Sequence, residues 1–292
     1  MLDYDMPLYR PPSEGNNLII QATLGCSFNQ CSFCSMYKEK TYQARPLKTV
    51  FTDIDRAASG WPDAQRIFLA DGDALALSSD HLLQILEYLD KSFPRLTRIS
   101  CYATPANIRR KTVAELEKLR RHRLSLLYFG IESGSDLVLK KITKGATSRT
   151  IGDSMQKVRD AGIKLSSTVV LGLGGADYWQ EHIDGTTELL NQAPSTYIST
   201  LQLYLEPSVQ QEFARKFKET FKMQDDWAIL AEQERLIANL DPPSPVIFRS
   251  NHASNALALA GNLPKDRDRL LAEIHRVQKG ERAVRPTFLR GL

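Results

Sequence analysis

The sequence predicts an α/β fold with a parallel sheet, and the main observation is a repeated alternation of strands and helices. Short apolar runs suited to buried strands alternate with segments of helical spacing between residues 18 and 205. The connecting loops are short, and six strand–helix units follow one another. Such repetition predicts parallel strands joined by right-handed crossovers. We therefore expect functional residues at the carboxyl ends of the strands.

Each element has its own signal. The first apolar run is suited to a buried strand, and a loop rich in cysteine follows it directly. Thr52 or Asp53 is expected to cap the first helix, and Gly60 begins the segment that stops it. Pro94 closes the second helix and Gly162 ends the fourth. The predicted strands are 18–23, 66–70, 98–102, 124–131, 164–171 and 197–205, and the predicted helices are about 52–59, 80–93, 112–122, 148–161 and 180–192.

Both ends of the chain depart from this alternation. Residues 1–17 are rich in Pro, Gly and Asn and are expected to form an irregular lead-in. Residues 18–206 form the predicted core, and residues 207–292 form a short, mainly helical extension that is expected to cover the mouth or the side of the core. Its predicted helices are about 208–221, 226–240 and 265–277, and between the last two lie an apolar run at 246–248 and a polar loop at 249–255.

The composition is that of an ordinary globular protein. Of the 292 residues, 42% are hydrophobic and 25% are charged, and the net charge is +4. No apolar run approaches the ~20 residues of a membrane span, and the N-terminus carries acids and no apolar signal segment, so we expect a cytoplasmic protein. The densest basic segment, 109–123, is predicted to be the solvated face of a helix, and nucleic-acid binding by it is an alternative that is not favoured.

Three of the four cysteines lie within nine residues, at Cys26, Cys31 and Cys34. Clustered thiolates are soft ligands for iron–sulfur clusters or zinc, and three protein ligands leave one metal position open, which suggests catalysis. A structural zinc site would need a fourth Cys or His nearby, whereas the nearest His is His81 and the other Cys is Cys101. Buried structural thiols are the remaining alternative. A cluster of thiolates also predicts a reducing compartment instead of disulfides.

These residues resemble the signature of the radical S-adenosylmethionine (SAM) superfamily, which has three cysteines, the last preceded by an aromatic residue, here Phe33. The spacing is C-x4-C-x2-C, one residue longer in the first interval than the commonest form. Within this superfamily, the sequence as a whole most resembles the branch of coproporphyrinogen oxidases and tRNA methylthiotransferases. The resemblance implies a partial (β/α)6 TIM-like barrel, a [4Fe–4S] cluster held by the three cysteines, and reductive cleavage of SAM to a 5′-deoxyadenosyl radical.

The turn Asp71, Gly72 and Asp73 is the first further element that the resemblance assigns. It follows the second predicted strand and resembles the element whose backbone carbonyls and acid receive the SAM ammonium. An acid beside an ammonium is electrostatically favourable. A plain turn is the alternative, because Asp-Gly-Asp is also good turn chemistry.

The remaining SAM contacts are assigned near the ends of the fourth and fifth strands. Glu132 and Ser133 belong to the segment GIESGS, where family members place an acid that hydrogen-bonds the ribose or the methionyl end of SAM. Lys144 resembles the basic residue that reaches the SAM carboxylate, and a solvated lysine is the alternative. Gly172 is expected to let the backbone approach adenine.

Two segments are close to the motifs of other cofactor sites, for dinucleotides and for cobalamin, but neither matches its motif fully. The segment GLGG that begins at Gly172 lacks the third glycine of a dinucleotide fingerprint, because Asp177 stands at that position. The segment QEHIDG that begins at Gln180 is close to the cobalamin-binding pattern D-x-H-x-x-G, but a glutamine stands where the aspartate is required.

Cys101 and His252 are the candidate catalytic residues beyond the cofactors. Cys101 ends the third predicted strand, where it could act as a hydrogen donor or thiyl relay, and buried packing is the alternative. His252 lies with Arg249, Asn251 and Asn255 in a polar loop that could cover the barrel mouth, and a capped loop is the alternative.

The sequence therefore predicts an oxygen-sensitive radical SAM enzyme that acts on an unidentified substrate. A reducing electron donor of the flavodoxin or ferredoxin type is the implied partner. RNA modification, above all of tRNA, is the alternative among enzymes. A non-catalytic iron–sulfur, SAM-binding or haem-trafficking protein is the alternative outside them.

Overall fold

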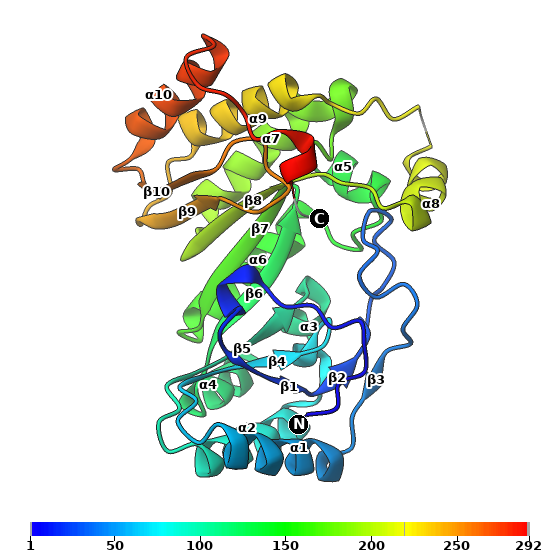
Figure 1. The fold of residues 1–292 in the computed structure, drawn as a ribbon, viewed down its shortest axis with the longest axis vertical. Coiled ribbons are helices and arrows are strands. Elements are labelled where there is room, and N and C mark those ends of the chain that lie inside the picture. Colours follow the sequence, from blue (N-terminus) through cyan, green and yellow to red (C-terminus); the bar gives the residue numbers. More distant parts are fainter. Residues whose placement is uncertain (1, 219, 291–292) are drawn as a thin grey trace. The chain divides into compact units, whose positions relative to one another are not determined.

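The computed structural model describes residues 2–218 and 220–290. The chain divides into two compact units, and each is described by itself (Figure 1). The first unit comprises Met1–Asn29, Cys34–Phe129 and Gln156–Leu165. The second unit comprises Gln30–Phe33, Gly130–Met155 and Ser166–Leu292.

Parallel strands in the order β1, β4, β5 and β6 form the sheet of the first unit. Helices connect successive strands, as the alternation in the sequence predicts. Helix α4 begins at a complete capping box, because the side chains of Thr112 and Glu115 each accept the other's backbone N–H. The elements are β1 (Leu18–Gln21), α1 (Leu47–Gly60), β4 (Arg66–Ala70), α2 (Ser79–Ser92), β5 (Arg98–Ala103), α3 (Pro105–Arg109), α4 (Val113–Arg121) and β6 (Leu124–Glu132), of which the last three residues belong to the second unit.

Shorter elements complete the first unit. The 3-10 turn η1 (Pro12–Glu14) precedes the sheet, and η2 (Ala74–Ala76) follows β4. The two-residue strands β2 (Thr23–Leu24) and β3 (Gln43–Ala44) pair antiparallel with each other. They frame the cysteine loop at both ends.

Helix α1 begins earlier than predicted. Its first residue is Leu47, and Pro46 fixes the entry of the chain, so Thr52 and Asp53 lie inside the helix instead of capping it. The carboxylate of Asp53 is used differently, because it pairs with Arg45 at 2.7 Å.

Alternation along the strands sorts the side chains of the first sheet into two faces. Phe68, Tyr102 and Tyr128 make edge-to-face contacts on one face, and Glu14 accepts a hydrogen bond from Tyr128 on that same side. Cys101 is one residue before Tyr102 and therefore points to the opposite face. Figure 1 shows that helices α1 and α2 cover that face.

The N-terminal segment has little regular structure, as expected, but it is firmly attached to the sheet. Glu14 is fully buried and accepts hydrogen bonds from Arg98, Ser100 and Tyr128. Near the start of the chain, the side-chain amide of Gln21 exchanges two hydrogen bonds with the backbone of Asp5. The segment is thus a structural part of the first unit.

In the second unit, parallel strands β7, β8 and β9 are followed by the antiparallel strand β10. The C-terminal extension thus adds strands to the sheet as well as helices. Strand β10 contains Gly261 and Asn262, which strands disfavour, so the sequence pattern did not predict it. The elements are α5 (Asp136–Lys141), α6 (Ser148–Asp160), β7 (Lys164–Leu171), α7 (Gly175–Gln192), β8 (Tyr197–Gln202), α8 (Pro207–Phe217), α9 (Asp226–Asn239), β9 (Val246–Ser250), β10 (Leu259–Leu263), α10 (Arg267–Gln278) and η3 (Thr287–Leu289). The last five residues of α6 and the first two of β7 belong to the first unit. Within the described residues, no helix is both long and apolar enough to cross a membrane.

Candidate functional site

The three clustered cysteines differ from the fourth in their exposure. Cys26 and Cys34 belong to the first unit and Cys31 belongs to the second, and all three are partly exposed. Cys101 is fully buried, and burial raises the pKa of its thiol to about 12. The clustered thiols are thus accessible to an incoming metal, whereas Cys101 has the surroundings of a packed core residue.

The loop after β4 lies directly against Cys26. The backbone N–H of Gly72 donates to the carbonyl of Gly25 at 3.1 Å. A Cβ atom at position 72 would lie 2.9 Å from the Cβ of Cys26 and 2.9 Å from the ring of Tyr37. Only glycine fits this contact, so the two predicted elements meet in the first unit through their backbones.

The carboxylates of Asp71 and Asp73 hold the cysteine loop. Oδ2 of Asp71 accepts the backbone N–H of Gly25 at 3.1 Å. Oδ1 of Asp73 accepts the backbone N–H of Ser27 at 3.0 Å, and its Oδ2 accepts the Nδ2 group of Asn107 at 2.9 Å. Both carboxylates are fully buried, and burial raises the pKa of Asp73. Their side chains therefore support the loop around Cys26, and a contact with SAM stays a prediction.

Lys40 is a member of this arrangement that the sequence did not reveal. Its ammonium pairs with Asp71 at 3.1 Å and with Asp5 of the N-terminal segment at 2.8 Å. The ring of Tyr9 packs edge-on against Tyr37 at 5.4 Å between centroids. These contacts join segments that are far apart in the sequence, and a lone lysine in a polar loop gives no local signal of them.

In the second unit, the segment around Cys31 is attached to the end of α5. Both the backbone N–H and the hydroxyl of Ser32 donate to the carbonyl of Ile142, at 2.9 and 3.2 Å. Phe33 packs against the apolar cluster of Val138, Ile142, Leu173 and their neighbours. The predicted aromatic residue therefore anchors the loop in the core of this unit.

Glu132 and Lys144 form an ion pair at the carboxyl end of β6. Oε1 of Glu132 accepts the ammonium of Lys144 at 3.0 Å, and the two side chains are 11% and 9% exposed. Glu132 has a φ of 65°, and its carboxylate folds back over Gly130, where an added Cβ would lie 2.0 Å from Oε1. The structure thus brings together two residues that the resemblance assigned to SAM.

His182, on helix α7, supports this turn through Ser133. The hydroxyl of Ser133 lies 2.8 Å from Nδ1 of His182, and Nε2 of the same ring lies 3.1 Å from the carbonyl of Val170. Burial lowers the pKa of His182 to about 4, so the imidazole is neutral at pH 7. The histidine of the cobalamin-like pattern therefore has a structural partner.

The glycines of the two segments lie against each other. A Cβ at Gly134 would lie 2.1 Å from the carbonyl oxygen of Gly185, and a Cβ at Gly185 would lie 2.9 Å from that of Gly134. The backbone N–H of Gly134 also donates to the hydroxyl of Thr186 at 2.8 Å. This backbone contact explains the glycines of both motifs.

Gly134→Ala is expected to destabilise the protein by about 2–3 kcal/mol, because the methyl group forces two backbones apart. The measurement is urea unfolding. Gly60→Ala is the matched control, since nothing lies within 4 Å of an added Cβ at this helix end, and it should leave stability unchanged or slightly raised. Equal stability of the two variants would contradict the close backbone contact.

Gly172 is held by a buried acid of the C-terminal extension. Its φ is 87°, and its backbone N–H donates to Oε2 of Glu232 at 2.7 Å. Glu232 lies on α9 and is fully buried, and burial raises its pKa to about 8. The sequence placed Glu232 in an ordinary helix and gave no sign of this contact.

Glu232 is expected to make stability depend on pH. In the folded state the carboxyl group keeps its proton up to about pH 8, whereas in the unfolded state it loses the proton near pH 4.5. The stability that the protonated carboxyl contributes to the folded state is therefore lost as pH rises between these two values. The free energy of unfolding should fall by at most about 1.4 kcal/mol per pH unit there. Glu232→Gln keeps the shape and removes this slope. The measurement is urea unfolding of the wild-type protein and of Glu232→Gln at pH 6 and at pH 8.5. An equal change in the free energy of unfolding of the two proteins between these pH values would contradict the raised pKa of Glu232.

Cys101 and His252 lie in different surroundings. Cys101 is on the helix-covered face of the first sheet, as described above. His252 is half-buried in the loop after β9, where Nδ1 lies 2.9 Å from the hydroxyl of Ser254, and burial lowers its pKa. Asn255 ties this loop to β8, because its Oδ1 accepts the N–H of Gln202 at 2.7 Å. A catalytic role of either residue stays a prediction.

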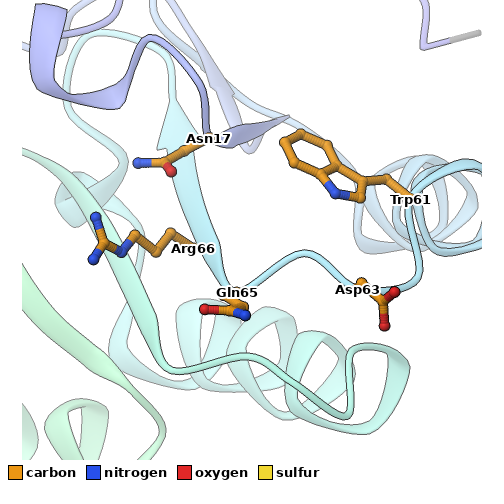
Figure 2. A pocket seen from close by; sticks show the side chains of 5 residues that line it. All are labelled: Asn17, Trp61, Asp63, Gln65 and Arg66. Atoms are coloured by element: carbon orange, nitrogen blue, oxygen red, sulfur yellow. The ribbon is translucent and has the colours of Figure 1, made fainter.

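A pocket of about 300 Å³ lies at the amino end of β4, away from the cysteine loop (Figure 2). Arg66 begins β4, whereas Asp71 follows its carboxyl end, so the two mark opposite ends of the strand. The lining residues are Asn17, Trp61, Asp63, Gln65 and Arg66. None of them is among the predicted site residues.

Comparison with known families gives a match over most of the predicted core. The sequence model of the radical SAM superfamily matches residues 20–185. This range contains the cysteine loop, the turn after β4 and the segment from Glu132 to Gly172.

Two curated relatives and one solved structure are similar to the chain. The heme chaperone HemW of Bacillus subtilis is 21% identical over 184 residues, which is 61% of this chain and 48% of the relative. A tRNA-2-methylthio-N(6)-dimethylallyladenosine synthase of Bordetella avium is 29% identical over 182 residues, which is 56% of this chain and 37% of the relative. The chain thus spans about half or less of the length of these relatives.

The coproporphyrinogen III oxidase HemN of Escherichia coli superposes with a TM-score of 0.57 at 14% identity, covering 76% of this chain and 51% of that one. At this identity the likeness concerns the fold alone. It confirms the predicted fold class, a mostly parallel α/β sheet with helices of the partial-barrel type.

Proposed function

The chain belongs to the radical SAM superfamily, and on that basis we propose that it is an enzyme that binds a [4Fe–4S] cluster and cleaves SAM reductively. The ligands in this proposal are Cys26, Cys31 and Cys34. The observation that carries it is that three thiols inside the matched range are partly exposed, and that the first of them, Cys26, lies so close to Gly72 that a Cβ added there would be 2.9 Å from its own Cβ. The whole enzyme's substrate stays unassigned.

The residues present fit such a cluster chemically. Thiolates are the usual ligands of iron–sulfur clusters, and three of them leave one iron for SAM. When bound, the cluster supplies the electron that breaks the sulfonium bond of SAM. Asp71 and Asp73 fix the backbone on both sides of Cys26, so the first ligand is oriented by the chain itself.

Glu132 and Lys144 fit the methionyl end of SAM in this proposal. That end carries an ammonium and a carboxylate, which are the charges complementary to a carboxylate and a lysine. The two side chains already neutralise each other at 3.0 Å, so each can exchange its partner for an opposite charge of the ligand. Ser133 and neutral His182 position the turn that carries Glu132.

The test is anaerobic reconstitution followed by reaction with SAM and dithionite. We expect about four irons and four sulfides per chain and formation of 5′-deoxyadenosine. A full cluster that yields no 5′-deoxyadenosine would favour the non-catalytic carrier. A reducing, cytoplasmic compartment and a low-potential electron donor belong to the same proposal.

RNA modification is the second candidate function. It is favoured by the likeness to the Bordetella synthase, whose name gives tRNA as its substrate. Salt-dependent binding of tRNA, with a linear fall of log affinity against log salt, would support it. Absence of binding at low salt would remove it.

A further inference from the structure

The pocket at the amino end of β4 is a second candidate binding site in the first unit (Figure 2). Its volume of about 300 Å³ is within the range of small-molecule sites, and all five lining residues belong to this unit. Strand β4 has five residues, so at ~3.3 Å per residue the pocket and the turn at Asp71 are ~16 Å apart. A ligand in this pocket would therefore leave the space around Cys26 free.

The two sides of the pocket carry different chemical groups. Figure 2 shows Trp61 and Asp63 on one side, Asn17 and Arg66 on the other, and Gln65 between them. Trp61 and Asp63 belong to the turn between α1 and β4, whereas Asn17 precedes β1 and Arg66 begins β4. One side thus offers an aromatic ring and a carboxylate, and the other offers a guanidinium and an amide.

Arg66 supplies an uncompensated positive charge. Its side chain is exposed, and within residues 2–218 and 220–290 its guanidinium forms no ion pair with a carboxylate. Its neighbour on β5, Arg98, is neutralised by the buried carboxylate of Glu14 at 2.9 Å. A guanidinium binds a phosphate group well, because two of its N–H groups can donate in parallel to two phosphate oxygens.

Asn17 is held beside Arg66. Strands β1 and β4 pair in parallel with Leu18 opposite Ile67, and Asn17 and Arg66 directly precede these two residues. Nδ2 of Asn17 donates one hydrogen to the buried carboxylate of Glu14. Because an amide nitrogen carries two hydrogens, the second one can be donated to the anion that Arg66 binds.

Trp61 offers a flat apolar surface on a fixed backbone. It is 45% exposed, although it is among the largest side chains of the protein. Its backbone N–H donates to the carbonyl of Ala57 at 2.7 Å, and its carbonyl accepts the N–H of Ala64 at 3.2 Å. An exposed indole of this kind is suited to stack on a planar ring, and nucleobases are stacked in this way in many proteins.

Asp63 and Gln65 can contact the polar edge of such a ring. The carboxylate of Asp63 pairs with Arg95 at 3.4 Å, and both side chains are about two-thirds exposed, so this pair is weak and leaves room for a ligand donor. The amide of Gln65 both donates and accepts, and its backbone carbonyl is fixed by the N–H of Thr97 at 2.8 Å. The acid repels a phosphate, which therefore belongs at the side of Arg66.

We propose that this pocket binds a nucleoside monophosphate, with the base stacked on Trp61 and the phosphate on Arg66 and Asn17. A free phosphate would leave the aromatic side unused, and an uncharged nucleoside would leave the guanidinium unused. The inference does not rest on the proposed function, because no lining residue belongs to the cysteine loop or to the residues assigned to SAM.

The test is a fluorescence titration with guanosine 5′-monophosphate, on the full chain with and without its reconstituted cluster. The chain has three tryptophans, so the double variant Trp179→Phe, Trp227→Phe leaves Trp61 as the reporter. Stacking of the base should quench this fluorescence in a saturable way. Guanosine and inorganic phosphate, added separately, should each bind at least about tenfold more weakly, because each lacks one of the two contacts.

Two further variants separate the contacts. In the reporter chain, Arg66→Met should weaken binding of the nucleotide at least about tenfold at low ionic strength and leave binding of guanosine unchanged, since only the phosphate loses its partner. Trp61→Leu, measured by calorimetry in the otherwise unchanged chain, should also weaken binding about tenfold. Thermal unfolding of both variants checks that they fold.

Arg109→Met is the matched control. It removes the same charge from an exposed arginine of the first unit, at the end of α3 and thus beyond the carboxyl end of β5. Its affinity for the nucleotide should equal that of the reporter chain. Equal affinity in Arg66→Met and Arg109→Met, or an absence of quenching by the nucleotide, would overturn the proposal.

Two other outcomes would assign the binding elsewhere. Displacement of the nucleotide by an equal concentration of SAM would place it at the proposed cofactor site and overturn the pocket. Quenching by single-stranded RNA without any response to the free nucleotide would overturn the proposal in favour of an RNA surface. Failure of the protein to take up iron contradicts the proposed function alone, because the nucleotide titration is also made without the cluster.

Discussion

Alanine at Cys26, Cys31 or Cys34 is expected to abolish the iron–sulfur cluster, leaving well under one of the about four irons per chain. Each thiolate would be one of only three protein ligands, so its loss leaves two irons open to solvent instead of one. All three residues are partly exposed, and in the described residues no other cysteine is available except buried Cys101. Iron and sulfide analysis after anaerobic reconstitution is the measurement.

Cys101→Ala is the matched control for these variants. Its thiol is buried on the helix-covered face, and its raised pKa keeps it protonated, so it is not a ligand in our interpretation. This variant should keep a full cluster. A full cluster in any one of the three ligand variants would refute the assignment of that cysteine.

Glu132→Gln and Lys144→Met are each expected to lower the affinity for SAM tenfold to a hundredfold, or by about 1.5–3 kcal/mol. Each change removes one of two opposite charges that lie 3.0 Å apart and are mostly shielded from solvent. The other charge loses this opposite charge, and the ligand loses one charge-assisted hydrogen bond. Calorimetry of SAM binding to cluster-loaded protein is the measurement.

Lys140→Met provides the control, because Lys140 is exposed on α5 and should not affect SAM binding. Iron content and thermal unfolding should be recorded for every variant. Unchanged affinity in both Glu132→Gln and Lys144→Met would show that the pair only stabilises the turn. A loss of affinity accompanied by a loss of iron would indicate misfolding.

The sequence revealed those parts of the fold and the site that depend on local patterns. The alternation of strands and helices predicted the parallel strands from β1 to β8 and the long helices between them, because burial on a parallel sheet leaves a continuous apolar run in each strand. It did not predict the short elements β2, β3, α3 and α5. The cysteine spacing and the segment around Glu132 are likewise contained in a few consecutive residues. Such features need no knowledge of which segments meet in space.

The sequence could not reveal residues whose role depends on a distant partner. Lys40 is held by ion pairs with Asp5 and Asp71. Glu232 accepts a hydrogen bond from the backbone of Gly172, sixty residues earlier in the chain. Neither residue stands in a recognisable pattern. Polar side chains at such positions are ordinarily solvated, and only the folded chain shows that Glu232 is buried and that the side chain of Lys40 is mostly shielded from solvent.

His182 shows the opposite case. A local sequence pattern is close to that of a cobalamin-binding histidine, but in the structure this histidine packs against the turn after β6. The histidine and the glycine of the cobalamin-like segment contact Ser133 and Gly134. A motif of this length occurs by chance, and its physical meaning depends on what the helix packs against.

The hydrogen bonds from Gly25 and Ser27 to the two aspartates have a consequence for the assembly of a metal site. Ordering the backbone of one residue costs about 1–2 kcal/mol of conformational entropy. Around Cys26 this entropy is already lost when the first unit folds, so iron does not have to order this part of the loop. The backbone around Cys26 therefore has its final conformation before iron binds. The free energy of iron binding at Cys26 then comes mainly from the sulfur–iron bond and is reduced little by the cost of ordering the loop.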